Sequence, residues 1–196
     1  MAAAREPTDS AAPGTPAAFQ RAVALLRGAA PRPEVRLAEI PAPGRLAPFA
    51  FALTGEVVSG DEELANGRLV LLHDPAGHEA WEGAFRLVTL VRATVDGEMA
   101  ADPLLAGVGW SWLRDALADH GAGYAAAAGT VTRASSESFG DLAGSGAMAE
   151  VELRASWTPT GDEFDVHLTA WVDVLCFFAG LPPVPPGVTP IPRRSL

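Results

Sequence analysis

The strongest constraint on the fold is a strict alternation of apolar and polar residues near the C-terminal end of the chain. In the segment AEVELRASW, Val151, Leu153, Ala155 and Trp157 alternate with charged or hydroxyl side chains. Successive side chains of a β-strand point to opposite faces, so this pattern is typical of a strand with one face in the core and the other in water. It predicts a sheet of which one face is buried.

Other segments add strands to this sheet. Apolar residues alternate over residues 49–57 and continue over 67–74, with an acidic loop expected at 59–67 (SGDEELANG). Residues 85–95 are apolar on both faces, which favours a central position in the sheet. The stretch GYAAAAGTVTRASS is ambiguous, because four alanines favour a helix whereas Thr-Val-Thr favours a strand. We predict a strand there, over about 126–135.

Helical periodicity is found in three further segments. Apolar spacing and terminal signals predict helices over 15–28, from Asp102-Pro103 to Gly121, and from about 162 to 179. The resulting order is α-β-β-β-α-β-β-α, which predicts an α+β fold with an antiparallel sheet of about five strands and helices mainly on one face. This element order resembles the fold of small acidic secretion chaperones and related stress proteins.

The domain boundaries follow from the same patterns. Residues 1–14 are expected to form a disordered N-terminal tail, residues 15–181 a single α+β domain, and residues 182–196 a proline-rich C-terminal tail. Within the domain, residues 29–47 are expected to form a proline-rich arm in which EVRLAEI makes a short edge strand.

The side-chain inventory excludes several kinds of chemistry. The chain contains no lysine and one cysteine, Cys176. Walker-type phosphate loops, pyridoxal Schiff bases and lysine nucleophiles all require a lysine. A disulfide, a CxxC redox pair or a multi-cysteine zinc site within the chain requires a second cysteine. We therefore expect no cofactor.

The charge is strongly negative in the middle of the chain. Residues 46–181 carry six arginines and twenty acids, whereas the whole chain has a net charge of −10. Such a charge repels phosphate backbones, so we expect no nucleic-acid partner. It suits a solvated surface or, alternatively, a face that binds a basic partner. Without a membrane-length apolar run or a secretory signal, we expect no membrane contact and a cytoplasmic location.

The densest polar cluster lies in the segment HDPAGHEAWEG, residues 73–83. A type I turn over residues 74–77 would bring His73 and His78 together, and two imidazoles with carboxylates suit a divalent transition metal. The motif HExxE stands where metalloproteases have HExxH. The alternative is a hairpin tip whose Asp74 caps its own turn. The candidate polar cluster is therefore His73, Asp74, His78, Glu79 and Glu82, with His73, His78 and Glu79 as metal-ligand candidates.

The remaining candidates have structural interpretations. Trp81 is a candidate exposed aromatic residue, since it lies in a polar segment. Residues 121–126 (GAGYAA) match GxGxxA, but they follow a helix and enter a strand, the reverse of the dinucleotide fingerprint. We expect His120 to occupy a helix C-terminus and His167 to stack or hydrogen-bond near Trp171. We expect Cys176 to be buried. The serines at 135, 136, 138 and 145 lack a GxSxG elbow and are expected to be loop residues.

Several longer segments carry a family resemblance. They are RLAPFAFAL, GRLVLLHDPAGHEAWEGAFRLVTLVRA, EMAADPLL with WSWL, GTVTRASS, RASWTP and AWVDVLCFFAGLPP, and they span about residues 30–183. The chain resembles an actinobacterial family of unknown function, number three thousand in the series of such domains. The resemblance implies a cytoplasmic protein of a GC-rich Gram-positive bacterium, in agreement with the missing lysine. It supplies no activity, ligand or catalytic residue.

Three hypotheses for function follow. The first is a non-enzymatic protein-interaction or chaperone-like adaptor module that binds a protein partner or forms a homodimer. The second is a small metal-dependent enzyme or hydrolase that uses the segment from His73 to Glu82. The third is a small-molecule sensor with a pocket between the alanine-rich strand and the final helix.

Overall fold

The computed structural model describes residues 14–136, 139 and 148–183. Within this part of the chain, six strands form one antiparallel sheet in the order β1-β2-β3-β4-β6-β5. The strands are β1 (Val35–Ile40), β2 (Phe49–Ser59), β3 (Glu62–His78), β4 (Gly83–Val95), β5 (Tyr124–Ser136) and β6 (Met148–Pro159). The predicted fold class is confirmed, and the sheet has one strand more than the five expected.

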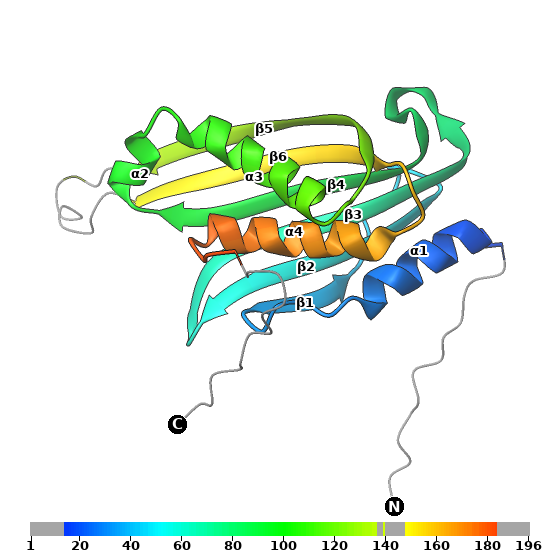
Figure 1. Ribbon diagram of the computed structural model, residues 1–196, viewed down its shortest axis with the longest axis horizontal. Helices are drawn as coiled ribbons and strands as arrows, with labels where there is room; N and C mark the ends of the chain where they lie inside the picture. The colour runs from blue at the N-terminus through cyan, green and yellow to red at the C-terminus, as the bar shows by residue number, and fades with distance from the viewer. Residues whose placement is uncertain (1–13, 137–138, 140–147, 184–196) are drawn as a thin grey trace, which may run out of the picture.

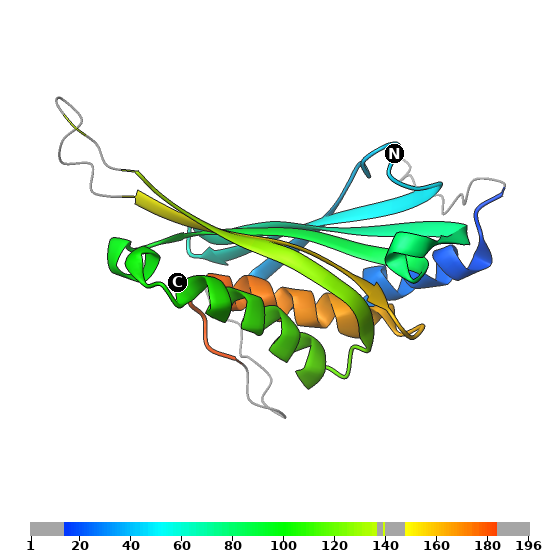
Figure 2. The same cartoon turned by 90° about the horizontal axis from the view of Figure 1, so that it is seen from above.

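The helices gather on one side of this sheet (Figures 1 and 2). They are α1 (Ala17–Gly28), α2 (Gly97–Ala101), α3 (Leu105–Asp119) and α4 (Phe164–Phe178), and a single 3₁₀ turn, η1 (Glu79–Trp81), lies between β3 and β4. α4 lies along the middle of the sheet between α1 and α3. No helix in the described part of the chain is long and apolar enough to span a membrane.

The alternation in β6 determines which face is covered. Val151, Leu153 and Trp157 are at most 1% exposed and belong to the core cluster that also contains the apolar stripe of α4. In β4 the pattern continues with Leu87 and Val91, which are fully buried. β4 lies between β3 and β6, so its predicted central position is confirmed.

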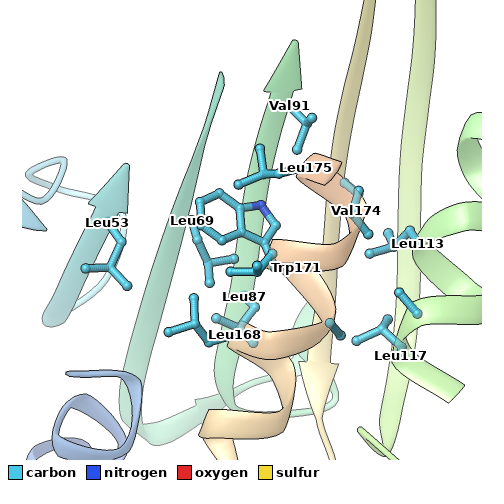
Figure 3. Packing of buried hydrophobic residues seen from close by; sticks show 14 of the residues in the cluster. Leu53, Leu69, Leu87, Val91, Leu113, Leu117, Leu168, Trp171, Val174 and Leu175 are labelled. Carbon is cyan, nitrogen blue, oxygen red and sulfur yellow. The ribbon is translucent and has the colours of Figure 1, made fainter. Parts of the chain in front are cut away.

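α4 approaches the sheet closely because two strands carry glycine beneath it. A Cβ atom on Gly55 would lie 2.6 Å from Leu175 Cδ1, and one on Gly67 would lie 2.8 Å from both Leu175 Cδ2 and the backbone oxygen of Leu90. The Trp171 ring lies over both glycines. Figure 3 shows Leu168, Trp171 and Leu175 directed from α4 toward the sheet, with Val174 facing Leu113 and Leu117 on α3.

Two expectations about the elements need correction, and a third is confirmed. The acidic segment 59–67 is not a loop: β2 and β3 continue to Ser59 and Glu62, because Gly60 adopts a φ of +64° and closes a tight turn. The segment EVRLAEI forms the short edge strand that was expected, β1, which pairs with β2 over six residues. The second helix begins at Leu105, and α2 precedes it, capped by Asp96, whose carboxylate accepts a hydrogen bond from Met99 N at 2.7 Å.

The ambiguous stretch at 124–129 is strand. Its irregularity is concentrated at Ala126, which has a φ of +48°, and the pairing with β6 shifts between Ala125 and Ala128. A bulge of this kind bends an edge strand without ending it. Residues 1–13 of the expected N-terminal tail and 184–196 of the expected C-terminal tail lie outside the described residues.

Candidate functional site

The predicted polar cluster forms the end of the β3–β4 hairpin. Asp74 Oδ1 accepts a hydrogen bond from Ala76 N at 3.0 Å, Gly77 has a φ of +77°, and ladder pairing resumes between His78 and Gly83. An Asp side chain that bonds the backbone two residues ahead closes its own turn. The segment therefore lies at the end of a hairpin, but the residues that Asp74 caps form an irregularity within β3, and the chain reverses at η1, which has no side-chain cap within the described residues.

The two histidines of the cluster have separate surroundings. His73 is buried on the helix side, where it stacks on Phe85 with ring centroids 4.1 Å apart and places Nδ1 3.0 Å from the Ala84 oxygen. His78 is exposed and stacks on Trp81, with centroids 4.7 Å apart. Among the described residues, no group of three or more His, Cys, Asp or Glu side chains is placed to hold a metal ion. The cluster therefore supplies no ligand set for the metal hypothesis.

Within the described part of the chain, the two glutamates of this hairpin and Trp81 also form no binding site. Glu79 and Glu82 are exposed. Trp81 is not an exposed aromatic residue: it is half-buried against the cluster formed by Ala52, Val70 and Leu72, and its backbone oxygen accepts a hydrogen bond from Thr158 Oγ1. The polar context of Trp81 in the sequence conceals this cluster, because its members come from other strands.

Several other candidates have structural roles. Trp157 Nε1 donates to His167 Nδ1 at 3.2 Å, and burial lowers the pKa of His167 from 6.5 to about 4. Burial likewise raises the pKa of the Cys176 thiol to about 12, so this thiol is unreactive at neutral pH. His120 caps α3 and places Nε2 2.7 Å from Asp173 Oδ2 on α4. The predictions for these three residues are confirmed.

The serine and glycine candidates show no site either. Ser135 and Ser136 are exposed at the end of β5, and Ser138 and Ser145 lie outside the described residues. The segment 121–126 leads from α3 into β5 in the expected direction. A Cβ on Gly123 would lie 2.5 Å from Thr160 Oγ1, so the lack of a side chain there serves close packing.

The side of the sheet opposite the helices, called here the helix-free face, presents a different kind of surface. Its strand positions alternate with the buried ones, and the register aligns them in rows across the sheet. One row runs from β3 to β5 and is small or apolar: Val70, Val88, Ser156 and Ala128. The adjacent row places an arginine on each side of a leucine: Arg68, Leu90, Arg154 and Thr130.

These two rows line a hollow in the helix-free face with a volume of about 700 Å³. Thr89, Gly129 and Ala155, which lie between the rows, complete its lining. Toward β2 the hollow ends at a covered region, where Ala42 and Ala47 of the β1–β2 connection pack on the cluster of Ala52, Val70 and Leu72. A hollow of this volume is within the range of small-molecule sites.

The charge of the helix-free face is opposite to that of the chain. The charged residues at its aligned strand positions are five arginines and four glutamates: Arg36, Glu56, Glu63, Arg68, Arg86, Arg92, Glu150, Glu152 and Arg154. Arginine therefore outnumbers glutamate on this face, whereas acids outnumber arginines by 24 to 14 in the whole chain. Such a local excess attracts anions against the field of the rest of the molecule.

The arginines next to the hollow differ in how they are paired. Arg154 Nε lies 2.5 Å from Glu152 Oε1 and Arg92 Nε lies 2.6 Å from Glu152 Oε2. Hydrogen bonds, first from Arg154 and then from Arg92, lower the pKa of Glu152 although its burial opposes them. Arg68 is exposed and makes no ion pair or side-chain hydrogen bond within the described part of the chain. Of the arginines that line the hollow, Arg68 is therefore the one whose positive charge can interact with a ligand.

Arg86 does not line the hollow itself, but it contacts Ser156, which does. It is 8% exposed and donates to three neutral acceptors, namely Ala126 O at 2.9 Å, Thr158 Oγ1 at 3.1 Å and Ser156 Oγ at 2.8 Å. Burial lowers the pKa of this guanidinium, an effect that Glu82 partly offsets. Through Ala126, Arg86 fixes the bulge in β5 and so the position of the strand that closes the hollow.

The comparisons with known proteins define the family. A family model described as "Protein of unknown function (DUF3000)" matches residues 15–189. The chain belongs to this family. The resemblance drawn from its segments is thereby confirmed. No curated protein and no solved structure matches the DUF3000 chain.

The hollow is the feature that the sequence interpretation missed. The expected sensor pocket between the alanine-rich strand and the final helix is not where the hollow lies, because Ala128 and Thr130 face away from α4. The available signal was the apolar residues at the outward positions of the central strand, Val88 and Leu90. A solvated face would carry polar residues there.

Proposed function

We propose that the protein is a non-catalytic binding protein that holds a small amphipathic anion in the hollow of its helix-free face. The observation that carries the proposal is an apolar floor beside an unpaired arginine in a chain of net charge −10. Arg68 supplies a charge-assisted donor, and Val70, Val88 and Leu90 supply apolar contact. A ligand with a carboxylate or phosphate at one end and an apolar body fits both features.

The acidic surface elsewhere favours binding of an anion at the hollow over binding at other places on the protein. An anion that approaches the described surface at random meets an excess of carboxylates, whereas the helix-free face has the opposite balance. Arg154 adds a second cation at the rim, although Glu152 already neutralises part of its charge. We therefore assign the anionic group of the ligand to Arg68 and its apolar body to the row that contains Val88.

Isothermal titration calorimetry with three ten-carbon probes tests this function. Decanoate should bind, whereas decanol should bind more weakly and decyltrimethylammonium should not bind in the hollow. The Arg68→Glu variant should weaken decanoate binding by at least about tenfold, which corresponds to about 1.4 kcal/mol. The Leu90→Asp variant should abolish binding.

The matched control is Arg36→Glu. Arg36 is an exposed arginine on the same face, but it lies on the far edge strand β1. Because both variants replace arginine by glutamate, they change the net charge equally. Equal loss of decanoate binding in the Arg36 and Arg68 variants, or equal binding of decanoate and decyltrimethylammonium, would contradict the proposal. Unfolding curves of each variant verify that the fold is retained.

A further inference from the structure

The two edges of the sheet differ in how they are protected. β1 is six residues long, carries Arg36 and Glu39, and is flanked by the prolines at 31, 33, 41 and 43. Glu39 also forms an ion pair with Arg27 of α1 at 2.6 Å. Short length, charge and proline are the devices by which proteins prevent an edge strand from pairing with another chain.

β5, at the other edge, has none of these devices. It is 13 residues long and contains neither proline nor an acidic residue. Its one charged side chain, Arg133, is turned to its own chain, where it donates to the backbone oxygens of Ala100 and Asp102. Beyond the bulge, β5 pairs regularly with β6 from Ala128 to Ser136, and its outer edge has no strand partner within the described residues.

The residues on the helix-free face of β5 form a palindrome. Ala128, Thr130, Thr132 and Ala134 read the same in both directions about Val131, and all four are exposed. Antiparallel pairing across a two-fold axis at Val131 would set each threonine opposite a threonine and each alanine opposite an alanine. Threonine pairs across strands are favourable, and a two-fold contact requires a self-complementary surface.

We propose that β5 pairs antiparallel with β5 of a second copy of this chain, so that two sheets join into one. A second copy fits this edge because the strand is self-complementary. The net charge of the chain opposes self-association, but β5 contains no acidic residue, so pairing two β5 strands places no two carboxylates of these strands opposite each other. Arg133 would lie opposite Gly129 of the other copy, where no side chain obstructs it. This inference does not depend on the ligand of the hollow.

The arrangement would also complete the hollow. Ala128, Gly129 and Thr130 line it on its outer side, where β5 is the last strand. A two-fold axis perpendicular to the sheet keeps both helix-free faces on the same side. The second β5 strand therefore extends the outer wall of each hollow.

Light scattering coupled to size-exclusion chromatography tests the interface. The unaltered chain should be a dimer and Thr132→Lys a monomer. The matched control is Ala38→Lys, an exposed position on the helix-free face of the other edge strand, which should remain a dimer. A monomeric unaltered chain, a dimeric Thr132→Lys variant, or dissociation of both variants would overturn the proposal. Circular dichroism verifies that Thr132→Lys is folded.

A distance measurement identifies the edge independently. Nitroxide labels on Thr132→Cys should lie close together, because the two Cα atoms would be about 7 Å apart as diagonal neighbours. Labels on Ala38→Cys should be about 50 Å apart, since five strand spacings separate β1 from β5 in each copy. The native Cys176 is fully buried and is not labelled. A short distance at position 38, or a long one at position 132, would also overturn the proposal.

Discussion

The face of the sheet that carries the helices and the face that does not share the same strands, yet they are packed in opposite ways. On the helix side, glycines at 55 and 67 let the Trp171 ring and Leu175 contact the strands directly. On the helix-free side, Val88 and Leu90 are only half-buried. The residue beside Leu90 on β3 is Arg68 and not a glycine. The first face is closely packed beneath α4, whereas the second leaves a hollow of about 700 Å³.

The difference separates stability from binding within one strand. In β3, Gly67 and Arg68 are adjacent and point to opposite faces. A change at Gly67 alters a contact that the fold requires, whereas a change at Arg68 alters a charge that the fold does not use. The two faces are therefore expected to respond independently to substitution.

The largest effect is expected for Gly67→Ala. The new Cβ would lie 2.8 Å from the Leu90 backbone oxygen, which cannot move without disturbing the ladder. We expect the free energy of unfolding to fall by about 3 kcal/mol, the upper range for overpacking. Urea unfolding measures this loss. Arg68→Ala, the adjacent control, should change it by less than about 0.5 kcal/mol. Similar losses in both variants would mean that the two faces are not packed differently.

A somewhat smaller effect is expected from His167 under the helices. Its folded pKa of about 4 lies below the ordinary 6.5, so its stabilising contribution is complete above pH 6.5 and is lost as the pH falls toward 4. The loss amounts to about 3 kcal/mol at most by linkage, and less if the site admits water. Unfolding curves between pH 7 and 4 measure it.

The control for this titration is His167→Asn, whose Oδ1 replaces Nδ1 as acceptor for Trp157 Nε1 but does not titrate. The unaltered chain should lose stability more steeply than the variant over this pH range. Parallel pH profiles would show that His167 is hydrated or protonated in the folded state.

The smallest effect is expected on the helix-free face, for Glu152→Gln. This substitution removes the shared carboxylate between Arg92 and Arg154, both of which are largely solvated. We expect a loss of about 0.5–1 kcal/mol at low salt that diminishes at high salt, as for other ion pairs near solvent. Glu150→Gln, which affects a longer contact of 3.7 Å to Arg92, should have less effect. A loss as large as that for Gly67→Ala would contradict the distinction between the faces.

Local patterns predicted the elements because the signals are local. Alternation in 149–157 identified β6, the segment 85–95 with apolar residues on both faces identified β4, and the stripe from Leu168 to Phe178 identified α4. The expectation of a loop at 59–67 was wrong because acidic residues indicate only that a segment is exposed. The exposed end of a hairpin is as compatible with acidic residues as a loop is. α2 was missed because five residues are too few for a periodic pattern.

The candidate site was less predictable for a physical reason. HDPAGHE attracted attention because its polar residues are adjacent in the chain, whereas the hollow combines residues from β3, β4, β5 and β6. Their proximity depends on the sheet order, in which β6 returns between β4 and β5. No local pattern specifies that β5, which precedes β6 in the chain, lies outside it.

The indole of Trp171 has a consequence for how occupancy of the hollow can be observed. Its Nε1 donates to Thr89 Oγ1 at 2.7 Å, and Thr89 Oγ1 donates to the backbone oxygen of Arg68 at 3.0 Å. Thr89 also lines the hollow. A fully buried fluorophore is thus connected by two hydrogen bonds to the residue that we assign to the anion. The chain carries its own optical reporter, on the far side of the sheet from the ligand it would report.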